Sequence, residues 1–285
     1  MIFHYLKIAF RNLCKHKTQN IISIIGLAVG LLCFCVCIYC SRFVESTDHC
    51  FANHDRIAEL NLYDGKADRY FSGSPVPLAE ELRTWSLGET EAISSVTYPR
   101  ERPYYVELSP EKTLPYELET IEIDTCYNKI FTPEMVAGHW KMASQSLNSV
   151  ILSQSMAIKI FGNAESAIGK HMTLMRRLNT SPESTPKTGG IVYIIQAVMK
   201  DIPLNNSLDF MQNIDMLTVN DSEGLLQSPK RHNMTGANTY VLLSPQTTCT
   251  DLEKQFSKRD YTYTLYDEAY TATASNMGSR LKKQG

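Results

Sequence analysis

The residues that come closest to known chemistry lie in a glycine-containing stretch near the middle of the chain. It reads GNAESAIGKH, from Gly162 through Gly169 and Lys170 to His171, and has the glycines and lysine of a phosphate-binding loop. Its two glycines are separated by six residues rather than four, and His171 replaces the Ser or Thr that would hold Mg²⁺. The stretch also follows an expected helix, whereas a phosphate-binding loop precedes one. We therefore expect no nucleotide site here, and a helix that ends at Gly162 explains the pattern better.

A second group of reactive side chains, Asp48-His49-Cys50 followed by His54-Asp55, has residue types that bind metal ions. However, no H-E-x-x-H or C-x-x-C spacing is present. We expect instead a solvated junction that caps and orients the end of the preceding helix. The remaining histidines are scattered, and no G-x-S-x-G motif occurs. The sequence thus predicts no catalytic residue, no metal site and no cofactor, and the protein is not expected to be an enzyme.

The eight cysteines are distributed unevenly. Four lie in an apolar stretch, where they would act as small hydrophobic side chains. Only Cys50, Cys126 and Cys249 follow that stretch. Because three is an odd number, at most one disulfide can form among them, and we expect no structural disulfide.

An uncharged stretch from Thr18 to Ser41 indicates how these residues are placed relative to a membrane. Its centre, from Ile21 to Cys40, reads IISIIGLAVGLLCFCVCIYC and is long enough to cross a hydrocarbon core of about 30 Å as a helix. Basic residues precede it and no acidic residue appears before Glu45, so the N-terminus is expected in the cytoplasm. The stretch is longer than the apolar core of a signal peptide, and no A-x-A-like site follows it.

Gly26 and Gly30 form a G-x-x-x-G pair inside this predicted span. Such a pair allows two membrane helices to approach closely. Glycine is also common in membrane helices without that role, so both interpretations stay open.

Residues 3–15, FHYLKIAFRNLCK, have the pattern of an amphipathic helix that lies on the inner membrane surface. Phe10 belongs to the apolar face, whereas Lys7, Arg11 and Lys15 lie on another face. We expect an interfacial helix that can also contact a cytoplasmic partner. A basic flank with no further role is the alternative.

The rest of the chain has the composition of an ordinary folded domain. The 285 residues include 28 basic and 30 acidic ones, with a net charge of −2, so no general basic face for nucleic acid is expected. About 245 residues follow the span, which is enough for one large domain or two lobes. Strand patterns such as LETIEID at 118–124 alternate irregularly with helix patterns such as SQSMAIKIF at 153–161. We expect an α+β fold, with one N-terminal transmembrane helix followed by a mixed α/β, two-lobed extracytoplasmic domain.

Four segments, at 6–31, 149–174, 191–211 and 238–245, together resemble FtsX/MacB-type ABC transporter permeases, in the form found in Bacteroidetes. The first is LKIAFRNLCKHKTQNIISIIGLAVGL at 6–31, and SVILSQSMAIKIFGNAESAIGKHMTL at 149–174 is similar to the family's strand–helix–FG–IGK–strand block. IVYIIQAVMKDIPLNNSLDFM at 191–211 resembles a V-x-x-D-I-P-x-N-S segment, and NTYVLLSP at 238–245 resembles the last strand. The residues that match the family's motifs after the span are Asp55, Arg56, Phe161, Gly162, Gly169, Asp201 and Pro203.

This resemblance implies a division of the chain into four parts. They are a cytoplasmic amphipathic helix at 1–17, a transmembrane helix at 18–41, a MacB-like periplasmic core domain at 42–260 and a C-terminal tail at 261–285. It also implies a single-pass protein of the bacterial inner membrane. The expected partners are a cytoplasmic ABC ATPase subunit, membrane lipid, a second permease chain in a homodimer or mixed pair, and a periplasmic protein.

The resemblance implies that the ATPase opens and closes as it binds and hydrolyses ATP. The membrane helices of the family convey this motion to the extracytoplasmic domain, which acts in efflux or extraction of a substrate. The sequence lacks the C-terminal membrane helices that typical members have after this domain. Three interpretations therefore stay open: the chain is a truncated permease, one part of a split permease, or a free-standing adaptor. The alternative function is a single-span sensor or adaptor that binds an envelope ligand without an ATPase.

Overall fold

The computed structural model of the chain describes residues 4–5, 11, 15, 17–71, 73–85, 87–88, 90–109, 112–174, 190–208, 213–222, 224–227, 235–259, 262–265 and 268–277. The chain forms two compact units that divide between residues 46 and 47. The first unit contains one long helix, and the second contains every strand of the described residues.

The first unit is built around α2 (Lys17–Glu45), a helix of 29 residues. At about 1.5 Å per residue, α2 is about 43 Å long, which exceeds the ~30 Å of a hydrocarbon core. Every side chain from Ile21 to Ser41 is exposed, although most are apolar. By length and composition, α2 is the one helix among the described residues that could cross a membrane. It contains the predicted span at 18–41 and continues beyond it to Glu45.

The second unit is an α+β domain, as predicted, and its strands form one sheet of 14 strands. The strands are β1 (Ile57–Asp64), β2 (Arg69–Phe71), β3 (Ser74–Pro75), β4 (Thr90–Thr97), β5 (Arg100–Ser109), β6 (Lys112–Ile123), β7 (Met135–Gly138), β8 (Ser149–Ser153), β9 (His171–Leu174), β10 (Val192–Met199), β11 (Met216–Val219), β12 (Thr235–Leu243), β13 (Thr262–Leu265) and β14 (Glu268–Asn276).

Six of these strands close into a ring, in the order β5–β6–β11–β8–β10–β9 and back to β5. Closure depends on residues 120–123 of β6, which run parallel to residues 216–219 of β11. In a closed sheet, alternate side chains of each strand point into the interior. Tyr104, Leu152 and Tyr193 are fully buried in the apolar cluster that fills this ring.

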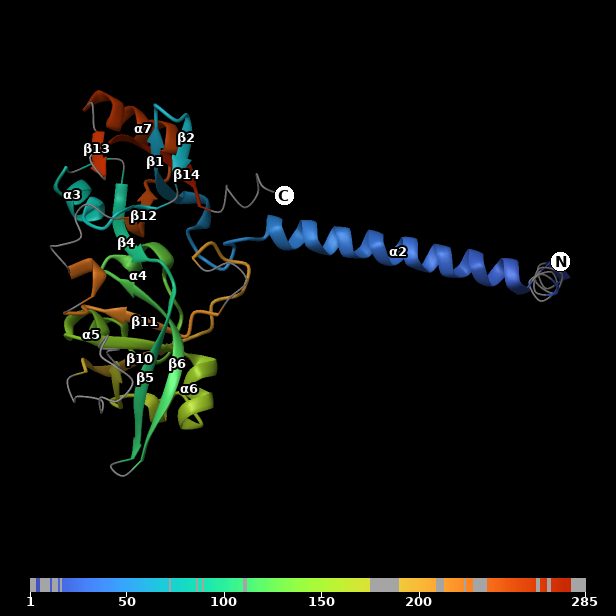
Figure 1. The fold of residues 1–285 in the computed structure, drawn as a ribbon, viewed down its shortest axis with the longest axis horizontal. Helices are drawn as coiled ribbons and strands as arrows, with labels where there is room; N and C mark the ends of the chain where they lie inside the picture. The colour runs from blue at the N-terminus through green and yellow to red at the C-terminus, as the bar shows by residue number, and fades with distance from the viewer. Residues whose placement is uncertain are drawn as a thin grey trace, which may run out of the picture. The chain divides into compact units, whose positions relative to one another are not determined.

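The remaining long strands form an open sheet in the order β4–β12–β1–β14–β13. This open sheet meets the ring where Val96 of β4 pairs with Ile123 of β6. β1 lies between β12 and β14, and pairs with β14 from Ala58 to Tyr63. In Figure 1 the open-sheet strands β1, β12 and β14 lie in the upper part of the domain, and the ring strands β5, β6 and β10 lie in the lower part.

Strands β13 and β14 belong to the residues that were predicted to form a C-terminal tail at 261–285. The two strands pair antiparallel, and β14 is an inner strand of the open sheet. Tyr270 is buried in contact with Leu62 of β1, and Met277 is buried in the central apolar cluster. The strand structure of the domain therefore extends past the predicted boundary at residue 260.

The helices cover the two parts of the sheet separately. They are η1 (His54–Arg56), α3 (Leu78–Thr84), α4 (Tyr127–Phe131), α5 (Trp140–Gln145), α6 (Gln154–Phe161), η2 (Glu165–Ala167), η3 (Leu225–Gln227) and α7 (Cys249–Lys258). α3 and α7 cover the open sheet through Leu82 and Phe256, whereas α6 packs on the ring cluster through Met156 and Ile160. A central cluster with residues of α4 and α5 joins the two parts, the ring and the open sheet, which we call the two lobes of the domain.

Candidate functional site

The predicted membrane-span residues Ile21, Gly26, Gly30 and Cys40 all lie on α2 and are exposed. A Cβ atom built at either glycine would meet no other atom within 4 Å. Among the described residues, the helix surface around the G-x-x-x-G pair is thus uncovered. This geometry leaves room for a second helix at that surface but does not select one.

The predicted interfacial helix is described only in part. Arg11 and Lys15 are helical and exposed. Lys7 and Phe10 lie outside the described residues, so the amphipathic face at 3–15 stays a prediction.

Residues 47–56, which we call the junction segment, follow α2 in the sequence and begin the second unit. Asp48 is 2% exposed and has a φ of 68°, a left-handed conformation that is uncommon outside glycine. Its backbone N–H donates to the Asn205 carbonyl at 3.0 Å, and its carboxylate accepts from the Ser207 N–H at 2.6 Å and from the Ser207 hydroxyl. The expectation of a solvated junction is therefore wrong at Asp48, because the loop after β10 covers it.

Arg56 binds the junction segment to the open sheet. Its guanidinium donates to the Glu91 carboxylate of β4 at 2.7 Å and to the Leu243 carbonyl of β12 at 3.0 Å. It also donates to the Asn53 side chain at 3.0 Å, which in turn donates to the Ile130 carbonyl of α4 at 3.3 Å. One cation thus connects the junction segment to two strands directly and to α4 through Asn53.

Asp55 precedes Arg56 in the sequence, but its side chain is exposed and does not bind the described strands of the open sheet. The Asp55 side chain is 87% exposed and contacts only His54 among the described residues, at 3.0 Å. The rings of His54 and His49 are stacked with centroids 4.5 Å apart. Among the described residues, no group of three or more His, Cys, Asp or Glu side chains could hold a metal ion.

A cavity of about 330 Å³ lies beside the junction segment. Cys50 and Phe51 line one part, and Asp201 and Pro203 of the loop after β10 line another. Burial, followed by the nearby Asp48 charge, raises the pKa of Cys50 to about 11. The Cys50 thiol is therefore protonated near neutral pH and is a poor nucleophile.

The other motif residues organise the α6 helix and the turn after it. The Ser153 side chain accepts from the Met156 N–H at 3.4 Å, and Asp201 accepts from the Ser155 N–H at 3.0 Å, so two side chains cap the helix start. Phe161, the last helical residue, packs on the ring cluster. Gly162 follows with a φ of 86° and donates to the Ile158 carbonyl, which confirms the predicted helix end.

Gly169 has a φ of 78°, and its N–H donates to the Ile195 carbonyl of β10 at 2.8 Å. It therefore turns the chain from η2 into β9. The motif that superficially looked like a phosphate loop is a helix end followed by a turn, as expected. The motif residues thus fall into two places, with Asp55, Arg56 and Pro203 near the junction segment and Phe161, Gly162 and Gly169 around α6. Asp201 belongs to both places, because it lines the cavity beside the junction segment and caps the start of α6.

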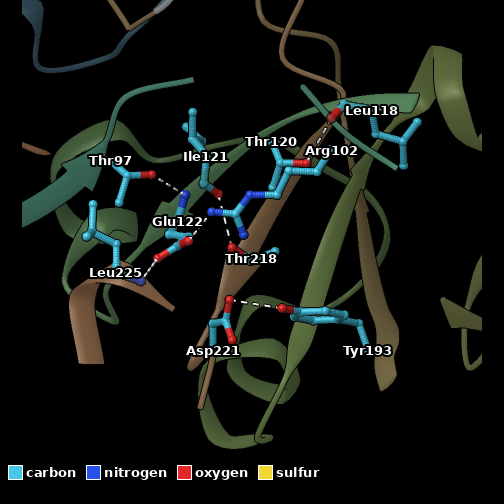
Figure 2. Close-up of polar contacts among 10 residues, drawn as sticks. All are labelled: Thr97, Arg102, Leu118, Thr120, Ile121, Glu122, Tyr193, Thr218, Asp221 and Leu225. Atoms are coloured by element: carbon cyan, nitrogen blue, oxygen red, sulfur yellow. Dashed lines mark hydrogen bonds and ion pairs between the residues drawn. The ribbon is translucent and has the colours of Figure 1, made fainter. Parts of the chain in front are cut away.

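The ring interior is polar at one end, where Arg102, Thr120 and Glu122 project inward from β5 and β6. Figure 2 shows the Arg102 guanidinium against the Glu122 carboxylate, with an N–O distance of 2.6 Å. The other Glu122 oxygen accepts from the Leu225 N–H at 2.5 Å. The Glu122 side chain is 3% exposed and the Arg102 side chain is 21% exposed, so the carboxylate is removed from water while the guanidinium keeps partial access to it.

Two tyrosines complete the polar end of the ring. Tyr193 donates to the Asp221 carboxylate at 2.9 Å (Figure 2). Burial, followed by the Asp221 charge, raises the pKa of Tyr193. Burial likewise raises the pKa of Tyr104 to about 12. Both phenols are therefore neutral at physiological pH, and that of Tyr193 serves as a hydrogen-bond donor.

This polar end opens into a cavity of about 420 Å³, which we call the acidic cleft. Among the residues that line it are Glu80, Arg83, Ser95, Glu122, Asp124 and Asp221. Asp124 is held by Arg83 and by the Ser94 hydroxyl, the latter at 2.7 Å. The cleft is thus a built feature with ordered carboxylates, although its residues match none of the predicted site residues.

No protein-family model and no curated protein matches the chain. Among solved structures, the chain is similar to a domain of a protein described as a permease from Porphyromonas gingivalis, with a TM-score of 0.58 and 19% identity over 80% of this chain and 93% of that one. It is also similar to the periplasmic region of MacB from Actinobacillus actinomycetemcomitans, with a TM-score of 0.50 and 13% identity over 83% of this chain and 94% of that one.

The second unit has the fold of a MacB-like periplasmic core domain. The likeness suggested by the motifs is therefore confirmed at the level of the fold. Within this MacB-like domain, sequence reasoning missed the acidic cleft and the ring-end ion pair. A signal was present in the sequence of β6. Leu118, Thr120 and Glu122 lie two residues apart, so their side chains share one face of the strand, and Thr120 and Glu122 are polar. An acid on a face with a buried leucine indicates a paired, buried charge.

Proposed function

We propose that the protein is a membrane-anchored component of an ABC transporter permease. In this proposal α2 crosses the inner membrane with its N-terminus in the cytoplasm, and the MacB-like domain lies in the periplasm. A separate cytoplasmic ATPase hydrolyses ATP, and the resulting motion of α2 moves the domain during efflux or extraction of a substrate. The protein itself performs no covalent chemistry.

The observation that supports this proposal best is the way the junction segment is bound. Asp48 is fixed to the loop after β10, and Arg56 is fixed to β4 and β12. Phe51 is 5% exposed and packs edge-on against Phe131, with ring centroids 5.0 Å apart. Motion that enters at the start of the junction segment would therefore reach both lobes of the domain rather than be lost in a flexible linker.

Capture of the ATPase tests the proposal. The full-length chain, carrying an affinity tag, is purified in mild detergent from its own host, and copurified proteins with ATP-hydrolysing activity are identified. We expect Lys7→Glu, Arg11→Glu and Lys15→Glu together to abolish capture, because they reverse the charge of the predicted interfacial helix. The matched control reverses three exposed lysines of the domain, Lys66, Lys129 and Lys141. Capture by the first variant at the control level would contradict the proposal.

The alternative, a single-span sensor or adaptor without an ATPase, is favoured by one observation, the acidic cleft. A ligand of that cleft would raise the melting temperature of the protein, since binding stabilises the folded state. Absence of a captured ATPase together with such a ligand would select this alternative.

A further inference from the structure

The outward side of the ring strands β5, β6, β9 and β10 carries an exposed row of largely apolar side chains. Successive residues of a strand point to opposite faces, and the inward set, with Tyr104 and Tyr193, is buried in the ring cluster. The outward residues that lie opposite one another in the register, from β6 across to β10, are Pro115, Tyr105, Thr173 and Val192. Val192 is 50% exposed and Pro115 is exposed, whereas the two residues between them are partly exposed. An antiparallel sheet normally presents polar side chains to water, so this row indicates a contact surface.

Glutamates border this row along β5 and β6. The outward residues of these two strands are Glu101, Pro103, Tyr105 and Glu107 of β5, and Thr113, Pro115, Glu117 and Glu119 of β6. Half of them are glutamates, and none is lysine or arginine. Glu101 lies directly opposite Glu119, although like charges at such positions destabilise a sheet. At the other end, the His171 imidazole lies 3.7 Å from the Glu107 carboxylate, so the negative charge is concentrated around Glu101, Glu117 and Glu119. We call these outward residues, together with Thr173 and Val192, the outer ring face.

The outer ring face suits a partner that lies on the strands rather than beside them. Residues 112–119 of β6 pair with β5, and no other described strand pairs with them. Their free edge contains Pro115, which has no N–H to donate, so a further strand added there would have a gap in its hydrogen bonds. In Figure 1 β5 and β6 reach the lower end of the domain, away from the strands of the open sheet. A partner at this end would therefore contact the side chains of the face.

We infer that the outer ring face binds a basic segment of another protein, in which lysine or arginine side chains flank an apolar one. The apolar row provides the centre of such an interface, and the glutamates provide its polar rim. Cationic side chains of the partner would offset the like charges of Glu101 and Glu119. The inference holds for a permease component and for an adaptor alike, so it does not depend on the proposed ATPase.

Charge argues against two other occupants of the outer ring face. A symmetric contact with a second copy of the chain would place the glutamates of one face against those of the other. Anionic lipid headgroups would be repelled by the same glutamates. A basic protein segment is the occupant that matches both the apolar row and its rim.

Photocrosslinking of the full-length chain in its own host tests this inference. Tyr105 is replaced by the photoreactive residue p-benzoylphenylalanine, and a second variant carries this residue in place of Val192, so that the test does not depend on one variant folding. We expect both variants to crosslink to the same protein, through a segment that contains lysine or arginine and is identified by mass spectrometry. The same replacement at Tyr70, which is 67% exposed on the open-sheet lobe, is the matched control and should give no such product.

Charge reversal then tests the chemistry of the contact. Glu117→Lys is expected to fold normally, because Glu117 is exposed, and to lower the crosslink yield from position 105 by about tenfold. Glu80→Lys reverses an exposed glutamate of α3 and should change the yield by less than about twofold. A lysine-to-glutamate change in the crosslinked segment of the partner should restore the yield in the Glu117→Lys background.

Four results would overturn the inference. The first is the absence of a crosslinked protein at both positions. The second is a product with a second copy of the chain, and the third is a product with lipid alone. The fourth is a protein partner whose crosslinked segment has no basic residue, or whose yield is the same with Glu117→Lys as with Glu80→Lys.

Discussion

The two lobes of the domain place their arginine–carboxylate pairs differently. In the ring, the Glu122 side chain is 3% exposed and its partner Arg102 is 21% exposed. The open sheet also buries polar side chains, such as Asn61 at 4% and Glu59 at 8% exposed, but its Arg56–Glu91 pair lies at the rim, where the two side chains are 29% and 42% exposed. Its interior, between the strands and helices α3 and α7, is formed by apolar side chains.

This difference follows from closure of the strands. A ring of strands has no free edge, so an inward polar side chain reaches water only at the ends of the ring and otherwise must find a partner inside. A side chain at the rim of an open sheet reaches solvent directly. Loss of an ion pair should therefore be costly in the ring and mild at the rim of the open sheet, which the following variants test.

The largest effect is expected for Glu122→Gln. This change leaves the half-buried Arg102 guanidinium without its counter-charge, and we expect the free energy of unfolding to fall by about 2–4 kcal/mol. Denaturant unfolding of the full-length chain in detergent, followed by tryptophan fluorescence, measures it. The double variant Arg102→Met, Glu122→Leu removes both charges and should be more stable than the single variant. A loss below about 1 kcal/mol for Glu122→Gln would contradict the proposed difference between the lobes.

A smaller effect is expected for Asp48→Ala in the junction segment, which contacts both lobes. Loss of two charge-assisted hydrogen bonds to Ser207 should lower the free energy of unfolding by about 1.5–3 kcal/mol. Asp55→Ala is the control, because its exposed side chain should contribute within about 0.5 kcal/mol. If both variants behaved alike, the contacts of Asp48 would not fix the junction segment.

Arg56→Lys tests the rim of the open sheet. The Arg56–Glu91 pair is partly exposed and is screened by solvent. We therefore expect the free energy of unfolding to fall by about 1 kcal/mol or less, and by less at high salt than at low salt. The same unfolding experiment at low and high salt measures it. A loss as large as that of Glu122→Gln would show that the rim and the ring interior do not differ.

The smallest effect is expected at α7, where Asp251 belongs to a capping box with Thr248. The hydrogen bond from Thr248, followed by that from Lys254, lowers the pKa of Asp251 to about 2 from an ordinary value of 3.8. Because the pKa is lowered on folding, the stabilisation is present above pH 3.8 and is lost as the pH falls towards 2. Asp251→Asn should reduce the acid dependence of stability in that window only. If the free energy of unfolding of Asp251→Asn depended on acidic pH in the same way as that of the unsubstituted protein, the capping box would not contribute to acid stability.

Local signals in the sequence predicted the elements whose contacts are local. Helix α2 was visible as an uncharged run, and α6 was visible from Ser153 at its start and Gly162 at its end. Both depend on neighbouring residues, which a sequence displays directly.

Elements that depend on distant partners were not predictable in the same way. Asp48 looked solvated because its partner Ser207 is 159 residues away. The four residues of β11 form a strand only because β6 and β8 lie on either side of them. The acidic cleft was missed for the same reason, since α3, β4, β6 and η3 assemble it from separate parts of the chain.

The position of β1 between β12 and β14 has a consequence for the order of folding during synthesis. β1 ends at Asp64, but its flanking strands lie at 235–243 and 268–276. Most of the domain must therefore leave the ribosome before β1 can complete its hydrogen bonds. Until then β1 exposes unpaired strand edges of the kind that promote aggregation. Delayed synthesis of the last strands should thus make the nascent chain dependent on chaperones, even though the finished domain is a single compact unit.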